Sequence, residues 1–536
     1  MNARRIMVLV ALVFMAFAAF CIANASFVAQ DGQRYFTIAD DALISLRYAW
    51  NLAHGHGLVW NAGERVEGFT NPLWTLYAAV WAVFTPRRLV PLVMQISGVL
   101  CLLAQACVFA RVMRALSAEH GRETPWKETL AFALPLTYGP LVYWSMDGLE
   151  VCLVGFLVSL AVLYYLQHRL MPVAVALGLA FWTRPDTALP AAVIMGMAGL
   201  DVLHDRDRLR PWLKTCGVLA GMVATVFILR EIYYGHTWPN TYVLKMRGFP
   251  LLARIKLNGL GYITPFLRET ALPLGLALLI LVVGWTRRRA LFAAVVLTMI
   301  AYAVYVGGDA LPHWRFIAPY VPFLGLVILD VDDDAGWLPA PRFLFRAAMV
   351  AALFSAWMMA AVEPLSSQAR GPQPIEQTNI ERALEINRLL KPAATIGVLH
   401  AGSIPYYTDF HACDFLGKCD KAIARLPPNL RGPSWGGMQS VPGHNKHNVY
   451  ASIAYGQPTY IQGCRWDEDS AADNVHHNYE YVPSSIDTYF SGTWILLLKY
   501  SPLVRWDRVL TQYQQHRLAA PSSVTNTAMM AKLRIQ

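Results

Sequence analysis

Long apolar segments recur along the first two thirds of the chain, separated by short stretches rich in Arg, Pro and Gly. An apolar helix needs roughly 20 residues to cross the hydrocarbon core of a bilayer. The pattern predicts about eleven membrane-spanning helices, at 6–27, 89–110, 129–146, 149–166, 170–184, 185–200, 213–233, 270–286, 290–306, 316–330 and 343–362. Arg184-Pro185-Asp186 breaks one adjacent pair. Non-helical backbone at that depth requires cover from protein or a water-filled cavity.

Residues 363–536 contain no apolar run long enough to span a membrane. Residues 375–390 have helical periodicity, whereas 395–399 and 494–498 have the pattern of short buried strands. Pro, Gly and His are frequent in 427–458, which indicates long loops. We therefore predict a polytopic α-helical membrane domain over 1–362, followed by a small α/β domain over 363–536.

Composition supports a membrane protein. The chain has 536 residues, of which 56% are hydrophobic and only 15% charged, which excludes a typical soluble protein and a disordered chain. The formal net charge of +10 first points to nucleic acid. Most of this excess, however, lies between the apolar runs of residues 1–362. That distribution is typical of basic cytoplasmic loops, so the expected partner is the lipid bilayer and not a nucleic acid.

The basic clusters predict an orientation. A cytoplasmic N-terminus and eleven crossings place every cluster in the cytoplasm and the C-terminal domain outside, on the periplasmic face of a bacterial inner membrane. The stretch 72–84 is too short to cross unaided, so we expect it to be re-entrant or half-inserted; if it crossed, every later loop would change sides. The clusters are Arg111/Arg114, His168/Arg169, Arg206/Arg208/Arg210, Arg287–Arg289 and Arg342/Arg346.

Three cysteines fall in the predicted external domain. In an oxidising compartment Cys413 and Cys419 could form a disulfide, although the third cysteine, Cys464, leaves the pairing open.

Unusual polar residues gather on the predicted outer face, beginning with the first external loop, 28–88. Asp40 and Asp41 start a helical pattern in that loop. One carboxylate can cap such a helix, but a cap needs only one, so the second is available as a base or as a cation ligand.

Further polar groups follow that loop. Residues 60–74 combine tryptophans with Glu64, Arg65, Glu67, Thr70 and Asn71; an interfacial aromatic belt explains the tryptophans but not the acids. Ionisable and amide side chains also stand at the outer ends of spans. Ion pairs between helices would account for single residues, but not for a whole set on one side of the membrane. The set includes Asp147, Glu150, Arg184, Asp186, His236, Asn240, Lys245, Arg247, Asp309, His313 and Arg315.

Carboxylates beside many cations suit the transfer of a group from a phosphate-linked donor. The cations would stabilise the leaving phosphate, and a carboxylate would take the proton of the attacking hydroxyl. A lipid-embedded donor would explain why the site lies at the membrane edge. The sequence has no glycine-rich nucleotide cradle ahead of a helix, which argues against a soluble nucleotide donor.

The first external loop carries a family resemblance, in Asp40-Asp41-Ala42 through Arg47-Tyr48, in 55–61 and in 63–71. Weaker echoes are Arg184-Pro185-Asp186, Pro239-Asn240-Thr241, Gly307-Gly308-Asp309 and Pro442-Gly443-His444. In these blocks the chain resembles membrane glycosyltransferases of the GT-C type, which use polyprenyl-phosphate sugars. It is most similar to the AftB-like terminal arabinofuranosyltransferases of mycobacterial cell walls. The resemblance implies a decaprenyl-phosphate-linked arabinofuranose donor and a saccharide or glycoprotein acceptor.

We therefore predict a membrane glycosyltransferase with Asp40 and Asp41 as catalytic base and partner. The two carboxylates could equally hold Mg²⁺ or Ca²⁺, so metal dependence stays open. The competing functions are a lipid-linked sugar flippase, which would need polar groups at mid-depth or on both sides, and a non-catalytic envelope assembly protein. Predicted phosphate contacts are Arg65, Arg184, Lys245 and Arg315; predicted sugar or acceptor contacts are Glu64, Glu67, Thr70, Asn71, Asp186, Asn240, Asp309, His313, His444 and Lys446.

Overall fold

The structure is a computed structural model, and it describes residues 2–119, 124–331, 366, 369, 371–432, 434–435, 437–465 and 468–519. The chain divides into two compact units. A helical unit comprises Met1–Phe27, Arg34–Gln373 and Leu416–Lys446, and a sheet unit comprises Val28–Gln33, Pro374–Phe415 and His447–Gln536. The boundary predicted after residue 362 lies outside the described residues. The division adds two features that no pattern indicated: Val28–Gln33 belong to the sheet unit, and residues 416–446 return to the helical unit.

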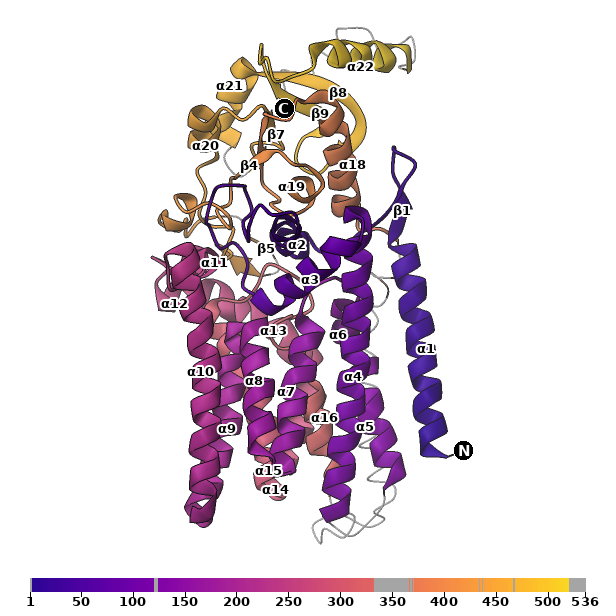
Figure 1. The fold of residues 1–536 in the computed structure, drawn as a ribbon, viewed down its shortest axis with the longest axis vertical. Helices are drawn as coiled ribbons and strands as arrows, with labels where there is room; N and C mark the ends of the chain where they lie inside the picture. The colour runs from indigo at the N-terminus through magenta and orange to yellow at the C-terminus, as the bar shows by residue number, and fades with distance from the viewer. Residues whose placement is uncertain are drawn as a thin grey trace. The chain divides into compact units, whose positions relative to one another are not determined.

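The helical unit is a bundle with short helices at one end (Figure 1). The N-terminal helix is followed by a hairpin of β1 (Ser26–Val28) and β2 (Arg34–Phe36). The α-helices of this unit are α1 (Ala3–Asn24), α2 (Asp40–Ala53), α3 (Pro72–Phe84), α4 (Val90–Glu119), α5 (Pro125–Thr137), α6 (Gly139–Ser145), α7 (Val151–Leu166), α8 (Leu170–Thr183), α9 (Ala188–His204), α10 (Leu209–Tyr234), α11 (Asn240–Met246), α12 (Leu251–Arg254), α13 (Leu260–Glu269), α14 (Ala271–Val283), α15 (Arg287–Val306) and α16 (Pro322–Leu329).

Short elements complete this unit. Single turns of 3₁₀-helix lie at η1 (Arg87–Leu89), η2 (Pro185–Thr187), η3 (Arg206–Arg208) and η5 (Ile423–Arg425), a π-turn lies at η4 (Ile255–Gly259), and β5 (Ser434–Trp435) pairs with β6 (Met438–Gln439).

Most apolar runs form helices close to their predicted bounds. Among the described residues, five helices are long and apolar enough to cross a membrane, and a sixth span arises if Leu251–Glu269 and Ala271–Val283, which meet at a bend of 81°, form one broken crossing. The segment predicted at 129–146 is divided at Tyr138 into α5 and α6, because Pro140 starts a new helix. The predicted segment 343–362 lies outside the described residues.

Proline and glycine set the helix ends that matter for the site. The break predicted at Arg184-Pro185-Asp186 is confirmed, since α8 ends at Thr183 and a 3₁₀ turn leads into α9. Gly235 ends α10 and Gly307 ends α15, each with positive φ, as expected where a helix closes in the left-handed conformation. The polypeptide therefore leaves the bundle at defined points on one end.

The short helix α3 lies with α2 at that same end of the bundle (Figure 1). Trp74 of α3 donates from Nε1 to the carbonyl of Gly148 in the α6–α7 connection, at 2.9 Å. With 13 residues, α3 packs against α2, α4 and α8. Whether this segment enters the bilayer stays a prediction.

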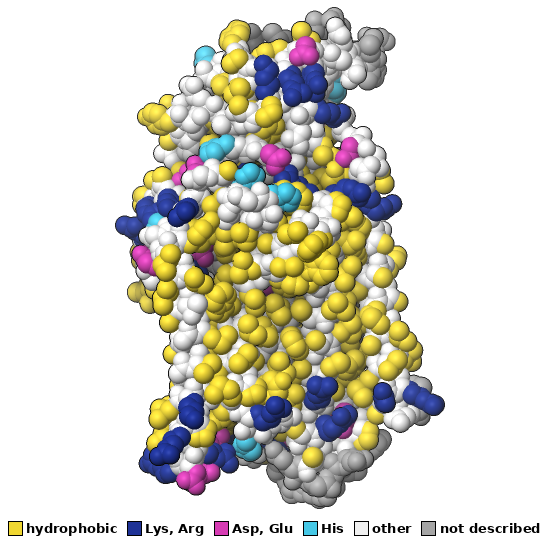
Figure 2. All heavy atoms as spheres, viewed as in Figure 1, with side chains coloured by type: hydrophobic (Ala, Val, Ile, Leu, Met, Phe, Trp, Pro, Cys, Tyr) yellow, Lys and Arg dark blue, Asp and Glu magenta, His cyan; other side chains and the backbone are white. Residues whose placement is uncertain are grey.

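The basic clusters of the described residues lie at the opposite end, whereas Arg342 and Arg346 lie outside the described residues. The connections that carry them join α7 to α8, α9 to α10 and α14 to α15, all at the lower end in Figure 1. Figure 2 shows hydrophobic side chains over the middle of the helical unit and Lys and Arg side chains below them. Arg208 contacts His168 at 3.2 Å, and Arg287 forms an ion pair with Asp201.

The sheet unit confirms the predicted α/β character. Helix α18 (Pro374–Leu389) and strands β3 (Thr395–Val398) and β9 (Gly492–Leu498) lie close to the predicted segments. The five-stranded sheet has the order β4-β3-β7-β9-β8, with β3 parallel to both of its neighbours and β9 antiparallel to both of its own. The remaining elements are α19 (Ser403–Tyr407), β4 (His411–Asp414), α20 (Val449–Gly456), β7 (Tyr460–Ile461), α21 (Glu468–Asn478), β8 (Tyr479–Thr488) and α22 (Trp506–Ala519).

The disulfide that Cys413 and Cys419 could form is not present in this structure. All eight cysteines lie in the described part of the chain, and none is in a disulfide. Cys413 belongs to β4, where it stands opposite Gly397 of β3. Cys419 instead places its Sγ 3.8 Å from the hydroxyl of Tyr48 within the helical unit. Five residues of separation were too weak a constraint to pair the two thiols.

Candidate active site

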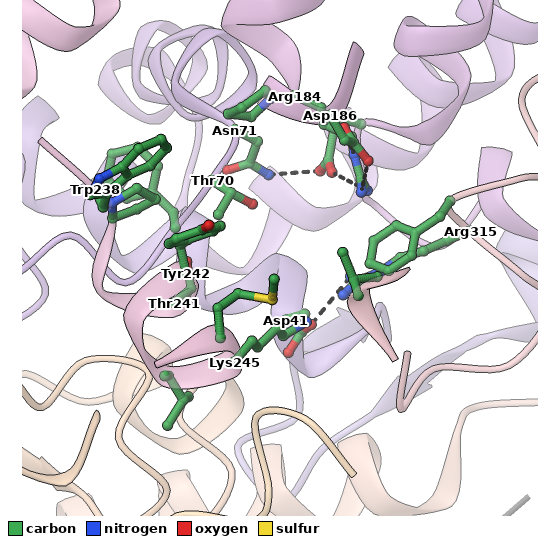
Figure 3. Close-up of a pocket in the computed structure, with 18 of the residues that line it drawn as sticks. Asp41, Thr70, Asn71, Arg184, Asp186, Trp238, Thr241, Tyr242, Lys245 and Arg315 are labelled. Atoms are coloured by element: carbon green, nitrogen blue, oxygen red, sulfur yellow. Dashed lines mark hydrogen bonds and ion pairs between the residues drawn. The ribbon is translucent and has the colours of Figure 1, made fainter. Parts of the chain in front are cut away.

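The helix ends at the upper end of the bundle enclose a cavity of about 590 Å³. Its wall is built from α2, the loop before α3, the break between α8 and α9, the α10–α11 turn and the end of α15 (Figure 3). Of the predicted site residues, seven line it: Asp41, Thr70, Asn71, Arg184, Asp186, Lys245 and Arg315. Segments more than 250 residues apart in sequence thus meet in one site.

Asp41 is the carboxylate that α2 presents to the cavity. The N-cap of α2 is Ala39, so neither Asp40 nor Asp41 is the capping residue, and both stand in the first turn. One oxygen of Asp41 accepts from Nη1 of Arg315 at 3.2 Å, and the other forms an ion pair with Lys418. Burial by itself would raise the pKa of Asp41, but Lys418 and Arg315 hold it well below its usual range. Asp41 is therefore a carboxylate fixed between two cations.

Arg315 links this carboxylate to a second one, Asp309. Its Nη2 donates to Asp309 at 3.1 Å, and its Nε lies 2.5 Å from the other oxygen of that carboxylate. Lys245 of α11 approaches Asp309 to 3.6 Å. Burial raises the pKa of Asp309, but Arg315 and Lys245 outweigh it and lower the pKa. Three cations, Arg315, Lys245 and Lys418, thus surround two carboxylates, Asp41 and Asp309.

Arg184 occupies a different electrostatic environment. It contacts Asp186 through Nη2 at 2.7 Å and Nε at 3.1 Å, and Glu150 through Nη1 at 3.2 Å. Glu150 also accepts from the Asn71 amide at 2.7 Å, and Asn71 in turn accepts from the Ser45 hydroxyl at 3.0 Å. Two carboxylates therefore already compensate the guanidinium, so Arg184 is a weaker candidate for a phosphate contact than the three cations near Asp41.

The remaining wall is largely apolar and includes several aromatic rings. Trp238 and Tyr242 stack at 4.9 Å between ring centroids with an interplanar angle of 23°, and Phe227 meets Trp238 edge-on at 5.8 Å. Phe316 lies under the Arg184 guanidinium at 4.8 Å. One side of the cavity is thus charged and the other is suited to apolar groups.

Two predicted residues, Asn240 and Glu67, lie outside the cavity wall and bind residues that line it. Asn240 donates from its amide to the carbonyls of Gly417, Lys418 and Asp420 at 2.9–3.0 Å, which fixes the loop that carries Lys418. Glu67 forms an ion pair with Arg230 at 2.6 Å, with both side chains 4% exposed. Arg230 itself lines the cavity. These two side chains thus hold residues that line the cavity, and their contact with a sugar stays a prediction.

Other predicted residues stand farther from the cavity lining. Arg65 covers the Tyr233 ring at 4.9 Å, and Glu64 accepts from the Asn61 amide at 2.9 Å. The ring of His313 packs against Tyr143 with 4.5 Å between centroids. Asp40 and His444 are absent from the lining.

Lys446 is buried against backbone oxygens. Its ammonium donates to the carbonyls of Val243 and Ala424, and burial lowers its pKa to about 8, with Arg247 adding to the shift.

The carboxylates do not fit a divalent cation. Both oxygens of Asp41 already face cationic side chains, which would repel a metal ion. Within the described residues, no group of three or more His, Cys, Asp or Glu side chains is arranged to hold one.

Comparison with known proteins identifies relatives of this chain. It is 29% identical over 248 residues to the terminal β-(1→2)-arabinofuranosyltransferase of Mycobacterium tuberculosis, a match that covers 44% of this chain and 34% of the relative. It is 26% identical over 384 residues to the enzyme of that name from Corynebacterium glutamicum, covering 61% of this chain and 52% of the relative. The matches thus span about a third and about half of the length of these curated relatives.

Two solved structures share the architecture. The chain aligns with ArnT from Cupriavidus metallidurans bound to undecaprenyl phosphate at a TM-score of 0.51 and 13% identity, covering 78% of this chain and 88% of ArnT. It aligns with the archaeal oligosaccharyltransferase AglB from Archaeoglobus fulgidus at 0.50 and 11% identity, covering 94% of this chain and 74% of AglB. The fold is that of the GT-C glycosyltransferases. At these identities the likeness establishes the fold and not the chemistry.

The predicted resemblance to GT-C enzymes and terminal arabinofuranosyltransferases is confirmed by these relatives. Residues 370–511 also match a family model described as a domain of unknown function, DUF8728. The apolar helices and the GT-C fold are those of a membrane protein.

Sequence reasoning did not assign a role to Lys418, Arg230 or Trp238, all of which line the cavity. Glu150 was noted as a polar residue between two spans but received no role. Arg230 near the end of an apolar helix was a usable signal, because an ionisable residue at membrane depth is a functional candidate. Lys418 had no local signal, since only the return of residues 416–446 to the helical unit brings it to Asp41.

Proposed function

We propose that this protein transfers a sugar, arabinofuranose, from a polyprenyl-phosphate donor to a hydroxyl of a cell-envelope glycan or glycoprotein. The observation that carries the proposal is the Asp41 carboxylate, held between Arg315 and Lys418 at the edge of a cavity with an aromatic wall. Similarity to arabinofuranosyltransferases supports the identity of the sugar.

The donor phosphate binds to Lys245, Arg315 and Lys418. These three cations surround Asp41 and Asp309, whereas the single guanidinium of Arg184 is already paired with two carboxylates, Glu150 and Asp186. Preorganised cations at the leaving group stabilise the charge that develops as the sugar–phosphate bond breaks. The prenyl chain lies along the aromatic wall of Phe227, Trp238 and Tyr242.

Binding of the phosphate activates Asp41. In the unliganded site, Lys418 and Arg315 make the carboxylate a weak base. A phosphate that shares these cations reduces their effect on Asp41 and raises its pKa toward that of a competent base. The acceptor hydroxyl then forms a bond to the anomeric carbon, the bond from that carbon to the phosphate oxygen breaks, and the hydroxyl proton passes to Asp41. The products are the glycosylated acceptor and polyprenyl phosphate.

We further propose that the site faces the periplasm, with the N-terminus in the cytoplasm. The described basic clusters lie at the end of the bundle opposite the cavity, as the enrichment of Lys and Arg in cytoplasmic loops requires. The same asymmetry favours a transferase over a flippase, because the described groups of the cavity lie at one end and form no path between the two faces.

The test uses the purified full chain in nanodiscs with radiolabelled polyprenyl-phosphate arabinofuranose and an arabinan acceptor. The expected result is label on the acceptor and stoichiometric release of polyprenyl phosphate. Asp41→Asn serves as the inactive control. In proteoliposomes, movement of the donor between leaflets without labelled acceptor would instead establish the flippase.

A further inference from the structure

A second cavity, here called the lower pocket, lies at the end of the helical unit opposite the candidate active site. It has a volume of about 540 Å³ and is formed where the lower ends of α7, α8, α9 and α10 meet (Figure 1). Its described lining shares no residue with that of the candidate active site. The lining is both cationic and apolar, and includes His168, Leu170, Met171, Arg208, Arg210 and Lys214.

Two cations of the lower pocket have no counter-charge in the described part of the chain. Arg208 is paired with Asp205 at 2.9 Å, and Asp201, the one carboxylate of the described lining, is already bound to an arginine outside it. The side chains of Arg210 and Lys214, by contrast, form no hydrogen bond or ion pair with a described residue, and both residues are exposed. A ligand that enters the lower pocket can therefore reach both charges.

The positions of these two cations are unfavourable as long as the lower pocket is empty. Arg210 stands in the first turn of α10, where none of the described residues is acidic, so its charge lies at the positive end of the helix dipole. Lys214 follows four residues later on the same helix face, and like charges at that spacing destabilise a helix. An anion bound by both side chains would offset both repulsions.

His168 adds an uncharged donor to the same wall. Its Nδ1 lies 3.2 Å from Nη1 of Arg208. Because a guanidinium can only donate, Nδ1 accepts this hydrogen bond and Nε2 carries the ring hydrogen. The residue is exposed, so this N–H group is available to a ligand. A guanidinium, an ammonium and an imidazole N–H together suit a group with several acceptor oxygens, such as a phosphate.

The surroundings favour a phosphate that is carried by a lipid. Leu170 and Met171 of α8 line the lower pocket, and Leu203 near the end of α9 and Leu213 of α10 are exposed. The segment that contains α10 is also one of the helices long and apolar enough to cross a membrane. Figure 2 shows Lys and Arg side chains directly below the hydrophobic band at this end of the helical unit. Basic pockets of this kind between membrane helices suit anionic lipid headgroups.

We propose that the lower pocket binds the phosphate of an anionic phospholipid. Arg210 and Lys214 contact the phosphate oxygens, and His168 donates from Nε2 to a further oxygen of the headgroup. The apolar side chains of α8 and α10 lie against the adjoining acyl chains. The site does not depend on the proposed sugar transfer, and the leaflet that supplies the lipid follows from the orientation proposed above.

The test measures binding of phosphatidylglycerol to the purified full chain in detergent by native mass spectrometry. Phosphatidylcholine, in which a choline cation balances the phosphate, is the reference lipid, and wild type should prefer phosphatidylglycerol. A basic residue close to an anionic lipid contributes about a factor of five in affinity, so Arg210→Gln and Lys214→Gln should each weaken phosphatidylglycerol about fivefold. Neither change should alter binding of phosphatidylcholine or the thermal unfolding midpoint without added lipid, because both side chains are exposed and unpaired.

Arg206→Gln is the matched control, since Arg206 is an exposed basic residue of the neighbouring turn η3 that does not line the lower pocket. It should keep the wild-type affinity. An equal loss in Arg206→Gln would show attraction to the basic surface as a whole and overturn the site, and so would a wild type without preference for phosphatidylglycerol or undiminished binding in Arg210→Gln and Lys214→Gln. Glycerol phosphate tests the source of the phosphate: if it binds as tightly as phosphatidylglycerol, the ligand is a soluble phosphate and the lipid site is refuted.

Discussion

Replacing Asp41 with asparagine should separate catalysis from donor binding. The substitution removes a carboxylate that contacts both Arg315 and Lys418. Asparagine has nearly the same size and keeps a carbonyl oxygen for these donors. Arg315 retains its second carboxylate, Asp309, at 3.1 Å. The loss of folding stability should therefore be modest, about 1–2 kcal/mol, because no buried cation is left without an acceptor.

The effects on transfer and on binding should have opposite signs. Loss of a general base lowers the rate typically about 10²–10⁴-fold. Donor binding should tighten, because the phosphate no longer competes with Asp41 for the two cations. Hydrogen bonds to charged groups contribute about 1.5–3 kcal/mol, so recovering one of them strengthens binding of polyprenyl phosphate roughly tenfold or more.

The assay measures release of polyprenyl phosphate for transfer and thermal stabilisation by added polyprenyl phosphate for binding. Asp40→Asn is the matched control, since Asp40 is the adjacent carboxylate in the same helical turn but is not part of the cavity lining. That control should keep transfer within a few-fold of wild type. Two results would refute the assignment of Asp41 as a base whose pKa is lowered by the cations that bind the donor phosphate. They are transfer by Asp41→Asn at more than a tenth of the wild-type rate, and a loss of polyprenyl phosphate binding in that variant.

Three further predictions address the surroundings of the site. Lys245→Ala should weaken polyprenyl phosphate about ten- to a hundredfold, because a charge-assisted contact is lost, and Lys245→Arg should recover only part; unchanged stabilisation by this ligand would remove Lys245 from the site. Burial raises the pKa of Asp147 to about 7. The protonated Asp147 carboxyl therefore contributes fully to stability below about pH 4, and this contribution is lost as the pH rises through about 7. At about pH 8, chemical denaturation should show Asp147→Asn to be more stable than wild type. Tyr48→Phe should lower the free energy of unfolding by about 1–3 kcal/mol, because the hydroxyl accepts from the Gly68 N–H at 2.8 Å and donates to the Val66 carbonyl at 2.6 Å; a variant as stable as wild type would show that these contacts are replaced by water.

Local sequence patterns were sufficient to predict most of the helices and strands and several of their ends. Apolar runs became helices, the Arg184-Pro185 pair ended α8, and the short apolar segments at 395–399 and 494–498 became strands of one sheet. Each of these features depends on neighbouring residues, through hydrogen bonding within the helix, the fixed φ of proline or the alternation of a strand. For that reason a single sequence carries the information.

Only some of the residues that form the site could be predicted from the sequence. The pattern placed Asp40 and Asp41 at the start of a helix but could not choose between them, since adjacent residues on a helix point in different directions. Packing turned Asp41 to the cavity. Likewise, Arg184 was recognisable as unusual, but its two carboxylate partners, Glu150 and Asp186, were fixed only when the α6–α7 and α8–α9 connections met.

The sequence by itself therefore determined a membrane bundle of the GT-C type, a second unit with a mixed sheet and a concentration of charge at one end of the bundle. Only the tertiary structure decided which charges meet. Lys418 reaches Asp41 across 377 positions of sequence, and Cys419 turns to Tyr48 instead of pairing with Cys413. Contacts of this kind arise from the way distant segments pack, and no pattern among neighbouring residues encodes them.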